Sequence, residues 1–386
     1  MTLIEHQRKF LPVGHGAFFV ERLYVNEQRV LSAVYDCGDS DKGTIVHSYI
    51  TQEFGADKES KEMIDLLFLS HFDSDHVNGL EYLQPYLSSK TRVFLPFYYT
   101  HMQSIYDRNK REGIEYVISI LGQSNIKPIL VQYGENYDQR PDIDIDEYDY
   151  ERNGGMIWSG QFITKKVQGQ PIWRYIPFNL FNEQSLYQDF LNKVTNGLGW
   201  NIAKLQDAAQ WTLKDRKDLR RIYRSFTKTN INDNSLMVLS DKAYRLDWCD
   251  TWIVSAEYQS QMKNQCWCDY CCCCPSCLYT GDTVLKRGAR KSKYINRYED
   301  FLKELKKYTD NVSLMQIPHH GSSNNTNIAT LSDCMSGRLF CNYGTQDTSN
   351  KTFILTQKVL ETVWKNIAKV TDLGSSVYEE HNRFFI

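Results

Sequence analysis

The chain has 386 residues, of which 41% are hydrophobic and 13% are aromatic. This apolar content is enough to bury a core, so global disorder is excluded, and the length suits one large domain or two ordinary ones. The formal net charge of −2 at pH 7 excludes a protein that binds nucleic acid through an overall basic field, so any such site has to be a local patch.

The first nine residues, MTLIEHQRK, lack the apolar core of a signal peptide. The sequence contains no run of about 18 apolar residues, so we expect no membrane partner and a cytoplasmic location. In that compartment the 11 cysteines are expected to be reduced or bound to metal rather than joined in a disulfide framework.

The first part of the chain alternates short apolar runs with turn residues, a pattern typical of strands. In chain order we predict strands at 17–20, 31–35 and 64–69, a helix after His76, a strand at 93–96, a helix at 102–122 and a strand at 126–133. The run at 64–69 is apolar on both faces, which suits a strand inside a layered sheet. This order of strands and helices indicates an α/β architecture. The acidic stretch at 142–151 has no periodicity and is predicted to be a solvated loop.

The pattern changes between residues 179 and 230. Apolar side chains recur there at intervals of three and four, and six Lys and Arg residues follow between 214 and 224. We interpret this segment as a helical insertion with a basic C-terminal half, which is either a solvated face or a phosphate-binding surface. Beyond it we predict strands at 235–239, 251–256, 277–280, 312–317 and 339–343, and helices at 297–308 and 354–368. Residues 1–178 and 231–386 are therefore expected to form one core around the insertion.

The segment Ser70-His71-Phe72-Asp73-Ser74-Asp75-His76 carries four side chains that can bind metal, directly after a buried strand and before a helix. A loop at the end of a strand can turn so that His71 and Asp73 face one ion while Asp75 and His76 face a second. Imidazole and carboxylate ligands together suit zinc, and a carboxylate-rich set also suits manganese. A single His or Asp is usually a surface or capping residue, but four at this spacing indicate half of a binuclear site.

Two further clusters follow predicted strands. Tyr279-Thr280-Gly281-Asp282 places a carboxylate after one strand, and Pro318-His319-His320-Gly321-Ser322 places paired imidazoles after another. A carboxylate between two cations can bridge them, and a His can complete the second coordination sphere. Each motif alone is weak, but the three motifs in this order reinforce one another.

Together these motifs resemble those of the metallo-β-lactamase superfamily, and most closely the branch that contains the hydrolase domain of the ComEC competence protein. The resemblance covers roughly residues 10–178 and 231–350. Besides the three motifs above, it is carried by Val13-Gly14-His15-Gly16, Asp36-Cys37-Gly38 and Asn234-Ser235-Leu236.

The resemblance implies a four-layer αβ/βα sandwich with two divalent ions, Zn²⁺ or Mn²⁺, at one edge. By motif position, His71 and Asp73 would hold the first ion, while Asp75, His76 and His319 would hold the second and Asp282 would bridge them. His320 would then be free to contact substrate or donate a proton, and Asp36 would orient a ligating His. Asn234 is the nearest candidate at the position where the superfamily often has a further His, so the first ion site is expected to be open or weak.

Two cations would lower the pKa of a bridging water, and Asp75 or a neighbouring carboxylate could take its proton. The same constellation serves phosphodiesters, lactones and thioesters, so the motifs do not select the bond. Basic residues after Asp282 would attract phosphate unless they form a solvated loop: Lys286, Arg287, Arg290 and Lys291. With the resemblance, they favour a phosphodiesterase or nuclease that acts on DNA or RNA.

The resemblance also implies a place in a bacterial conflict or phage-defence system, with an operon-encoded protein as partner. Two alternatives remain open. The chain could hydrolyse a small ester, lactone or cyclic nucleotide, or it could be a degenerate metal-binding scaffold that recruits a partner protein.

Seven cysteines lie between residues 266 and 277, and they include two C-x-x-C pairs, Cys268 with Cys271 and Cys274 with Cys277. Zinc knuckles normally lie a dozen or more residues apart, whereas only two residues separate these pairs, so a single tetrahedral site would be cramped. Three interpretations stay open: an inert loop, a structural site for zinc or another soft metal, and a redox sensor.

Overall fold

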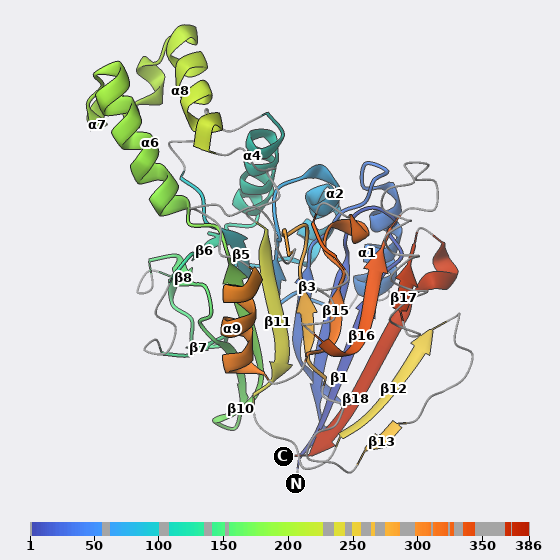
Figure 1. Ribbon diagram of the computed structural model, residues 1–386. Helices are drawn as coiled ribbons and strands as arrows, with labels where there is room; N and C mark the ends of the chain where they lie inside the picture. The colour runs from blue at the N-terminus through green and yellow to red at the C-terminus, as the bar shows by residue number, and fades with distance from the viewer. Residues whose placement is uncertain are drawn as a thin grey trace.

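In the computed structural model the chain forms two mixed β-sheets packed face to face, with helices on their outer faces (Figure 1). The structure describes residues 2–55, 62–99, 108–134, 141–150, 154–226, 235–243, 249–255, 264–266, 275–285, 298–309, 312–322, 325–327, 335–343, 367–371 and 373–385. Within these ranges, no helix is both long and apolar enough to cross a membrane.

The first sheet has the strand order β13-β12-β18-β1-β2-β3-β4-β5-β6-β8. Its strands are β1 (Leu3–Phe10), β2 (Phe19–Val25), β3 (Gln28–Tyr35), β4 (Leu66–Phe68), β5 (Arg92–Pro96), β6 (Ile129–Gln132), β8 (Met156–Trp158), β12 (Cys249–Ser255), β13 (Asn264–Cys266) and β18 (Tyr378–Phe385). The run from β3 to β8 is parallel and the other pairs are antiparallel. Because parallel strands end at the same edge, the loops after β3, β4, β5 and β6 emerge side by side.

The second sheet has the order β17-β16-β15-β14-β11-β10-β9-β7. Its strands are β7 (Ile143–Asp144), β9 (Ile163–Val167), β10 (Gln170–Asn179), β11 (Leu236–Lys242), β14 (Cys277–Tyr279), β15 (Val312–Gln316), β16 (Met335–Asn342) and β17 (Ile367–Val370). The strands β14 to β17 are parallel. The loops after β14 and β15 therefore leave this sheet at one common edge.

Three buried apolar clusters separate the layers. One lies between the two sheets and includes Phe68 and Tyr175. A second joins the outer face of the first sheet to helices α1 (Thr44–Phe54), α2 (Ser74–Val77), α3 (Leu80–Leu83) and α4 (Arg108–Gln123). The third packs Phe178 and Leu239 of the second sheet against Phe301 of α9 (Tyr298–Tyr308). The α/β class and the two-sheet sandwich are thus confirmed, while the family-specific fold remains a prediction.

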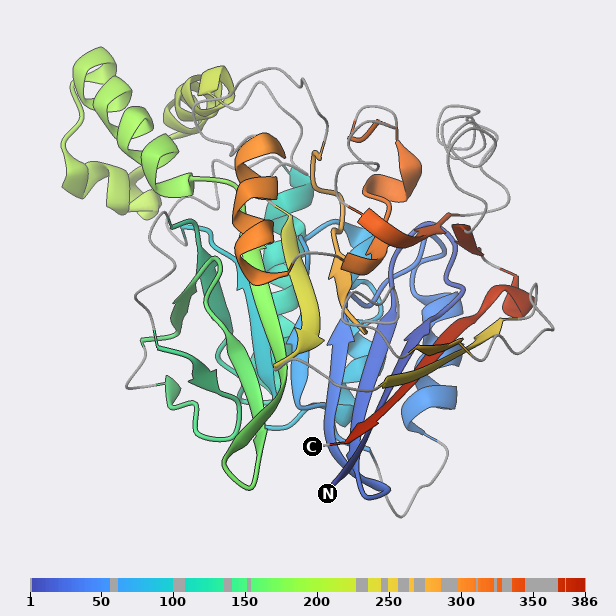
Figure 2. The same cartoon turned by 60° about the horizontal axis from the view of Figure 1, so that its bottom comes forward.

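Helices α6 (Glu183–Leu198), α7 (Ile202–Gln206) and α8 (Leu213–Phe226) connect β10 to β11. They project from the sandwich in both views, and we call them the helical arm (Figures 1 and 2). Asn182 and Asn201 cap α6 and α7 by accepting a hydrogen bond from the backbone N–H three residues on. The buried side chains of the arm continue the cluster beneath α4.

Some predicted elements need correction. The acidic stretch at 142–151 contains β7, which pairs with β9. Ile367 and Ala368, expected to end a helix, begin β17, and residues 351–366 lie outside the described ranges. The strand β1 was not predicted because its buried face carries the polar side chains of His6 and Arg8, which conceal the apolar alternation.

Arg8 forms the centre of a buried ionic network across three neighbouring strands. It lies directly opposite Glu21 on β2 and Glu380 on β18. Its Nε donates to Glu21 Oε1 at 2.6 Å, its Nη1 donates to Glu380 Oε1 at 3.2 Å, and its Nη2 donates to the carbonyl of Pro275 at 2.9 Å. Burial alone would raise the pKa of Glu21, but the guanidinium of Arg8, together with His6 and Tyr279, outweighs burial and holds that pKa well below its ordinary value.

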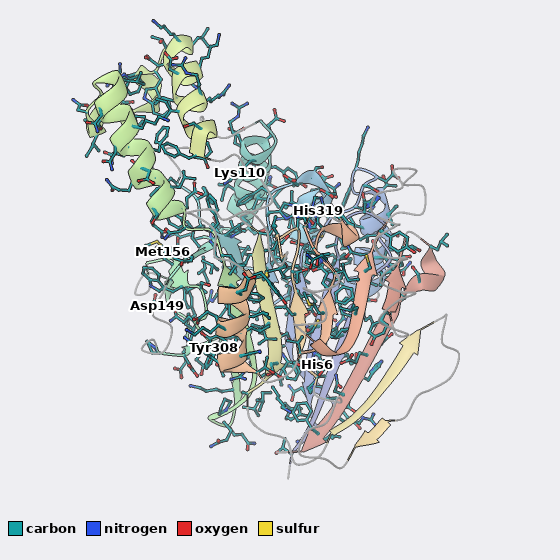
Figure 3. The ribbon with its side chains drawn as sticks, in the orientation of Figure 1. His6, Lys110, Asp149, Met156, Tyr308 and His319 are labelled. Carbon is teal, nitrogen blue, oxygen red and sulfur yellow. The ribbon has the colours of Figure 1, made fainter. Side chains whose placement is uncertain are left out.

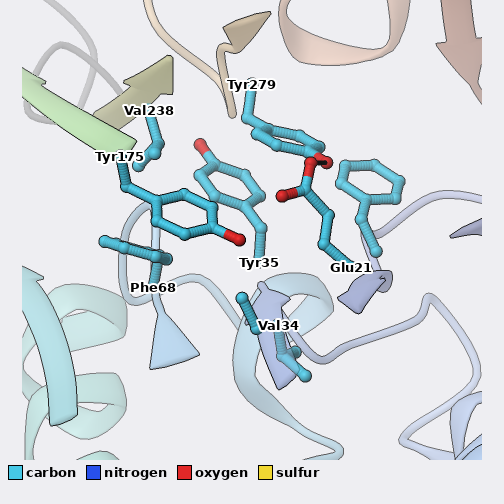
Figure 4. Close-up of a pocket in the computed structure, with 9 residues that line it drawn as sticks. Glu21, Val34, Tyr35, Phe68, Tyr175, Val238 and Tyr279 are labelled. Atoms are coloured by element: carbon cyan, nitrogen blue, oxygen red, sulfur yellow. Dashed lines mark hydrogen bonds between the residues drawn. The ribbon is translucent and has the colours of Figure 1, made fainter. Parts of the chain in front are cut away.

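A small cavity lies beside this network, between the sheets (Figure 4). The ring of Tyr175 reaches across it towards Glu21, with Tyr35 and Tyr279 along its wall. At about 10 Å³, it has room for roughly one water molecule. This cavity is too small for a substrate, so a functional site has to be sought elsewhere.

Replacing Arg8 with Met should destabilise the fold strongly, because it leaves the carboxylate of Glu21 buried without its cation. We expect the free energy of unfolding, measured by urea denaturation, to fall by about 3–5 kcal/mol. Lys9→Met is the matched control, because the partly exposed Lys9 pairs with Glu53 at 3.2 Å near the surface and should cost less than about 1 kcal/mol. Equal losses in the two variants would contradict the role given to Arg8.

Candidate metal centre

Three segments that are remote in sequence meet at the carboxyl ends of parallel strands. Residues 70–76 follow β4 and lead into α2, Asp282 follows β14, and residues 319–321 form a 3-10 turn after β15. In Figure 3, His319 lies at the end of the sandwich where α2 is found, whereas His6 lies nearer the chain termini. The two sheets thus contribute side chains to one common edge.

Gly281 allows the turn after β14 to approach the loop after β4. Its φ is +51°, and a Cβ there would lie 2.6 Å from the Cβ of Ser70, so any other residue would force the segments apart. The side chain of Gln316 fixes this turn, since its Oε1 accepts the N–H groups of Thr280 at 2.9 Å and Gly281 at 3.0 Å. Asp282 is thereby placed beside His71.

The Asp282 carboxylate, 4% exposed, faces four imidazoles through its two oxygens. Oδ1 lies 3.4 Å from His76 Nε2 and 4.0 Å from His320 Nε2. Oδ2 lies 3.4 Å from His319 Nε2 and 3.7 Å from His71 Nε2. Two groups of side chains could each hold a metal ion, one formed by His71, His76 and Asp282 and the other by Asp75, His76 and His320.

Asp73 and Asp75 complete the cluster on its more exposed side. Asp73 Oδ2 lies 3.7 Å from His71 Nε2, and Asp75 Oδ2 lies 3.8 Å from His76 Nε2 and 3.7 Å from His320 Nε2. Their side chains are 27% and 34% exposed, whereas that of His76 is fully buried. Solvent or a substrate can therefore approach from the side of these two carboxylates.

The spacing of these atoms fits a metal ion. Ligands at about 2.0–2.1 Å from a tetrahedral ion lie roughly 3.4 Å apart, which is close to the distances found. The Nε2 atoms of His71, His76 and His320 are buried and form no hydrogen bond within the part of the chain that the structure describes. Buried ring nitrogens normally have a partner, so a cation is the group that these residues fit.

Hydrogen bonds behind two of the rings direct their Nε2 lone pairs into the cluster. The buried carboxylate of Asp36 accepts the hydroxyl of Ser70 at 2.7 Å and His76 Nδ1 at 2.8 Å. Because the single hydroxyl hydrogen of Ser70 is used on Asp36, Ser70 can only accept from His71 Nδ1, at 2.8 Å. Both imidazoles therefore carry their proton on Nδ1, as ligating histidines do.

His320 is oriented in the same way by Asn342. Its Nδ1 lies 2.9 Å from the backbone carbonyl of Asn342, which can only accept, so Nε2 again faces the cluster. The side chain of Asn342 donates to the carbonyl of Gly16 and accepts from Gln316 at 3.1 Å. Sequence analysis did not identify Asn342 or Gln316 as site residues. The signal available for Asn342 was its place in N-Y-G at the end of a predicted strand.

The cluster has a strongly negative potential. Burial opposes protonation of His76, but the neighbouring carboxylates, Asp282 first, outweigh it and raise the pKa of this imidazole well above its ordinary value. Burial likewise opposes protonation of His320, while Asp75 and Asp282 raise its pKa. Burial favours the neutral form of Asp282, yet the imidazoles hold its pKa well below the usual range. A divalent cation gains from the same potential.

The two imidazoles after β15 lie differently from what the motif positions implied. We expected His319 beside Asp75 and His76, with His320 free, but the structure places His320 in that group and leaves His319 30% exposed near the other oxygen of Asp282. The reason is local, because both residues have left-handed backbone angles, with φ of 48° and 52°. This turn directs the second ring towards Asp75 and His76 and the first ring towards Asp282 Oδ2.

Several predicted residues lie outside the described ranges: Asn234, Lys286, Arg287, Arg290, Lys291, Cys268, Cys271 and Cys274. Cys277 is described, and its side chain is buried in β14 within the cluster between the sheets. Burial raises the pKa of its thiol, which disfavours the thiolate that a metal requires.

A scan of the chain against protein-family models finds no match, and a search of curated proteins finds no significant match. The case for a metal centre therefore depends on the geometry of the side chains.

Replacing Asp36 with Asn should weaken metal binding without touching a ligand. The amide would offer a donor where Ser70 and His76 require an acceptor, and His76 would lose the hydrogen bond that keeps its proton on Nδ1. We expect the affinity for Zn²⁺, measured by competition with a chromophoric chelator, to fall roughly 10- to 100-fold.

Asp65→Asn is the matched control for this variant. Asp65 precedes β4 at the opposite end of that strand, and its carboxylate accepts the N–H of Ser32 at 2.7 Å. Its replacement should leave the Zn²⁺ affinity unchanged. An Asp36→Asn protein that binds Zn²⁺ as tightly as the wild type would show that Asp36 does not orient a ligand.

Proposed function

We propose that the chain is a metal-dependent hydrolase with a binuclear His/Asp centre, and that its substrate is a phosphodiester of DNA or RNA. The observation that carries the proposal is the convergence of buried Nε2 atoms from His71, His76 and His320 on the carboxylate of Asp282. Buried, oriented imidazoles around a buried carboxylate have no evident structural purpose, because apolar packing would be more stable there.

Two features favour two ions over one. The oxygens of Asp282 face different side chains, so this carboxylate is placed to bridge an ion near His71 and Asp73 and an ion near Asp75, His76 and His320. The cluster also contains four carboxylates, those of Asp36, Asp73, Asp75 and Asp282. With neutral imidazoles, their total negative charge balances the positive charge of two divalent cations.

Two bound cations supply a water of lowered pKa and stabilise negative charge on the attacked centre. The chain supplies the rest. Asp36 and Asn342 hold the imidazoles of His76 and His320 in the tautomer that leaves Nε2 free to bind. Asp75, the most exposed carboxylate of the cluster, is placed to accept a proton from water on the substrate side.

The described part of the helical arm supports a phosphate-bearing substrate. Helix α8 contains six basic and two acidic side chains, and Lys214, Lys217 and Arg221 are exposed on it. Positions separated by three and four residues share one face of a helix, so these three lie on one basic face, where Arg221 also pairs with Asp218 at 3.1 Å. Such a surface attracts phosphates even though the net charge of the chain is −2.

Asp282→Ala and Asp75→Ala should each lose both bound metal and hydrolysis. We expect activity on bis(p-nitrophenyl) phosphate with Zn²⁺ or Mn²⁺ to fall by more than the roughly 10- to 100-fold loss typical of an orienting residue. Metal content is measured on the same samples, and thermal melting checks that the variants remain folded.

Asp146→Ala is the control, since the carboxylate of Asp146 pairs with Lys165 at 2.8 Å away from the cluster. Wild-type rates in both Asp282→Ala and Asp75→Ala would refute the catalytic assignment. Parallel assays on p-nitrophenyl butyrate and on single- and double-stranded DNA and RNA identify the bond. Hydrolysis of the ester alone would replace the phosphodiesterase with an esterase.

A further inference from the structure

The edge that carries the metal centre continues into a group of aromatic side chains. The strands β4 and β5 are parallel neighbours, so the segment Phe97-Tyr98-Tyr99 after β5 leaves the sheet beside the metal-binding loop after β4. Tyr98 is buried and packs against Phe72 of that loop, with ring centroids 5.5 Å apart. Tyr99 follows it and is partly exposed.

The N-terminal end of α6, which we call the foot of the helical arm, contacts this segment. The ring of Tyr187 on α6 lies 4.3 Å from the ring of Tyr99, measured between centroids, with an angle of 33° between their planes. Gln184 fixes the foot of α6 over the end of β6, since its Nε2 donates to Gln132 Oε1 at 2.7 Å. Tyr187 is also partly exposed. We call Tyr99 and Tyr187 the aromatic pair.

Two points indicate what this surface binds. Tyr99 follows β5, the neighbour of β4, so the aromatic pair lies on the same edge of the first sheet as the loop that carries His71 and His76. The arm that carries Tyr187 also carries the basic surface of α8, and α6 and α8 pack together through Phe190 and Tyr223.

We propose that a base of a single-stranded nucleic acid stacks on an outer face of the aromatic pair, Tyr99 and Tyr187, and that phosphates of the same strand contact Lys214, Lys217 and Arg221 of α8. Exposed aromatic rings together with basic side chains are the combination by which proteins bind single strands, and the helical arm links the two here. A duplex offers no unstacked base, so the strand has to be single at this point. The inference rests on the proposed function and names its substrate class.

Binding without metal tests this inference separately from hydrolysis. A fluorescein-labelled 20-nucleotide DNA strand is titrated with the full chain in EDTA, and the dissociation constant is measured by fluorescence anisotropy. Tyr99→Leu and Tyr187→Leu should each weaken binding roughly tenfold or more. Tyr99→Phe and Tyr187→Phe should retain wild-type affinity, because phenylalanine keeps the stacking face.

An abasic strand of the same length is the decisive probe, because it keeps the phosphates and lacks the bases. The wild type and the Leu variants should bind it equally. Tyr49→Leu, a partly exposed tyrosine on α1, is the matched control and should change neither constant. Lys214→Gln and Lys217→Gln together should weaken binding of both probes and reduce its salt dependence.

Three outcomes would overturn the inference. These are no effect of the Leu variants, an equal loss on the normal and abasic strands, and no binding of either strand by the wild type. The remaining result, a tyrosine effect confined to the base-containing strand, supports it. If the protein binds the strand in this way but does not cleave it after Zn²⁺ or Mn²⁺ is added, the proposed hydrolysis is rejected and the binding site is retained. Cleavage that does not depend on the tyrosines would do the reverse.

Discussion

The carboxylate of Asp282 is the group on which the arrangement of the candidate metal centre depends. A buried carboxylate is costly unless positive charge or donors surround it. Here imidazoles from the loop after β4 and from the turn after β15 approach its two oxygens. Because these segments come from different sheets, the packing of the sandwich and the geometry of the cluster are coupled through this one side chain. Gly281 allows the contact by bringing the turn after β14 against Ser70.

The two buried ionic clusters of the sandwich solve the same electrostatic problem in different ways. Between the sheets, the chain itself provides the cation, since Arg8 lies between Glu21 and Glu380. At the metal centre, the ion partners found for Asp73 and Asp75 among the described residues are imidazoles. Imidazoles oriented with Nε2 inward can accept a cation from solution, whereas a guanidinium cannot. The first cluster is therefore neutralised within the chain, and the second is suited to bind metal.

The sequence predicted the α/β class from the order of strands and helices. It also singled out residues 70–76 as a candidate metal-binding segment, because His and Asp side chains there directly follow a buried strand. It could not predict which imidazole of the pair after β15 lies beside Asp75 and His76, since that depends on left-handed backbone angles at His319 and His320. It also missed β1, whose buried face carries Arg8, and the orienting role of Asn342. That role belongs to the backbone carbonyl of Asn342, which no residue type reveals, and the Asn342 side chain contacts Gly16 in a distant segment. Local sequence patterns indicate amphipathic strands and helices. They do not indicate buried polar side chains whose hydrogen-bond or ion-pair partners lie far away in the sequence.

Anomalous diffraction from crystals grown with Zn²⁺ or Mn²⁺ is the most direct test of the central claim. The account predicts two peaks about 3.5–4 Å apart on either side of Asp282, one near His71 and Asp73 and the other near Asp75, His76 and His320. A chain that shows no peak at this edge, or peaks only at other surfaces, would contradict the assignment of a binuclear centre.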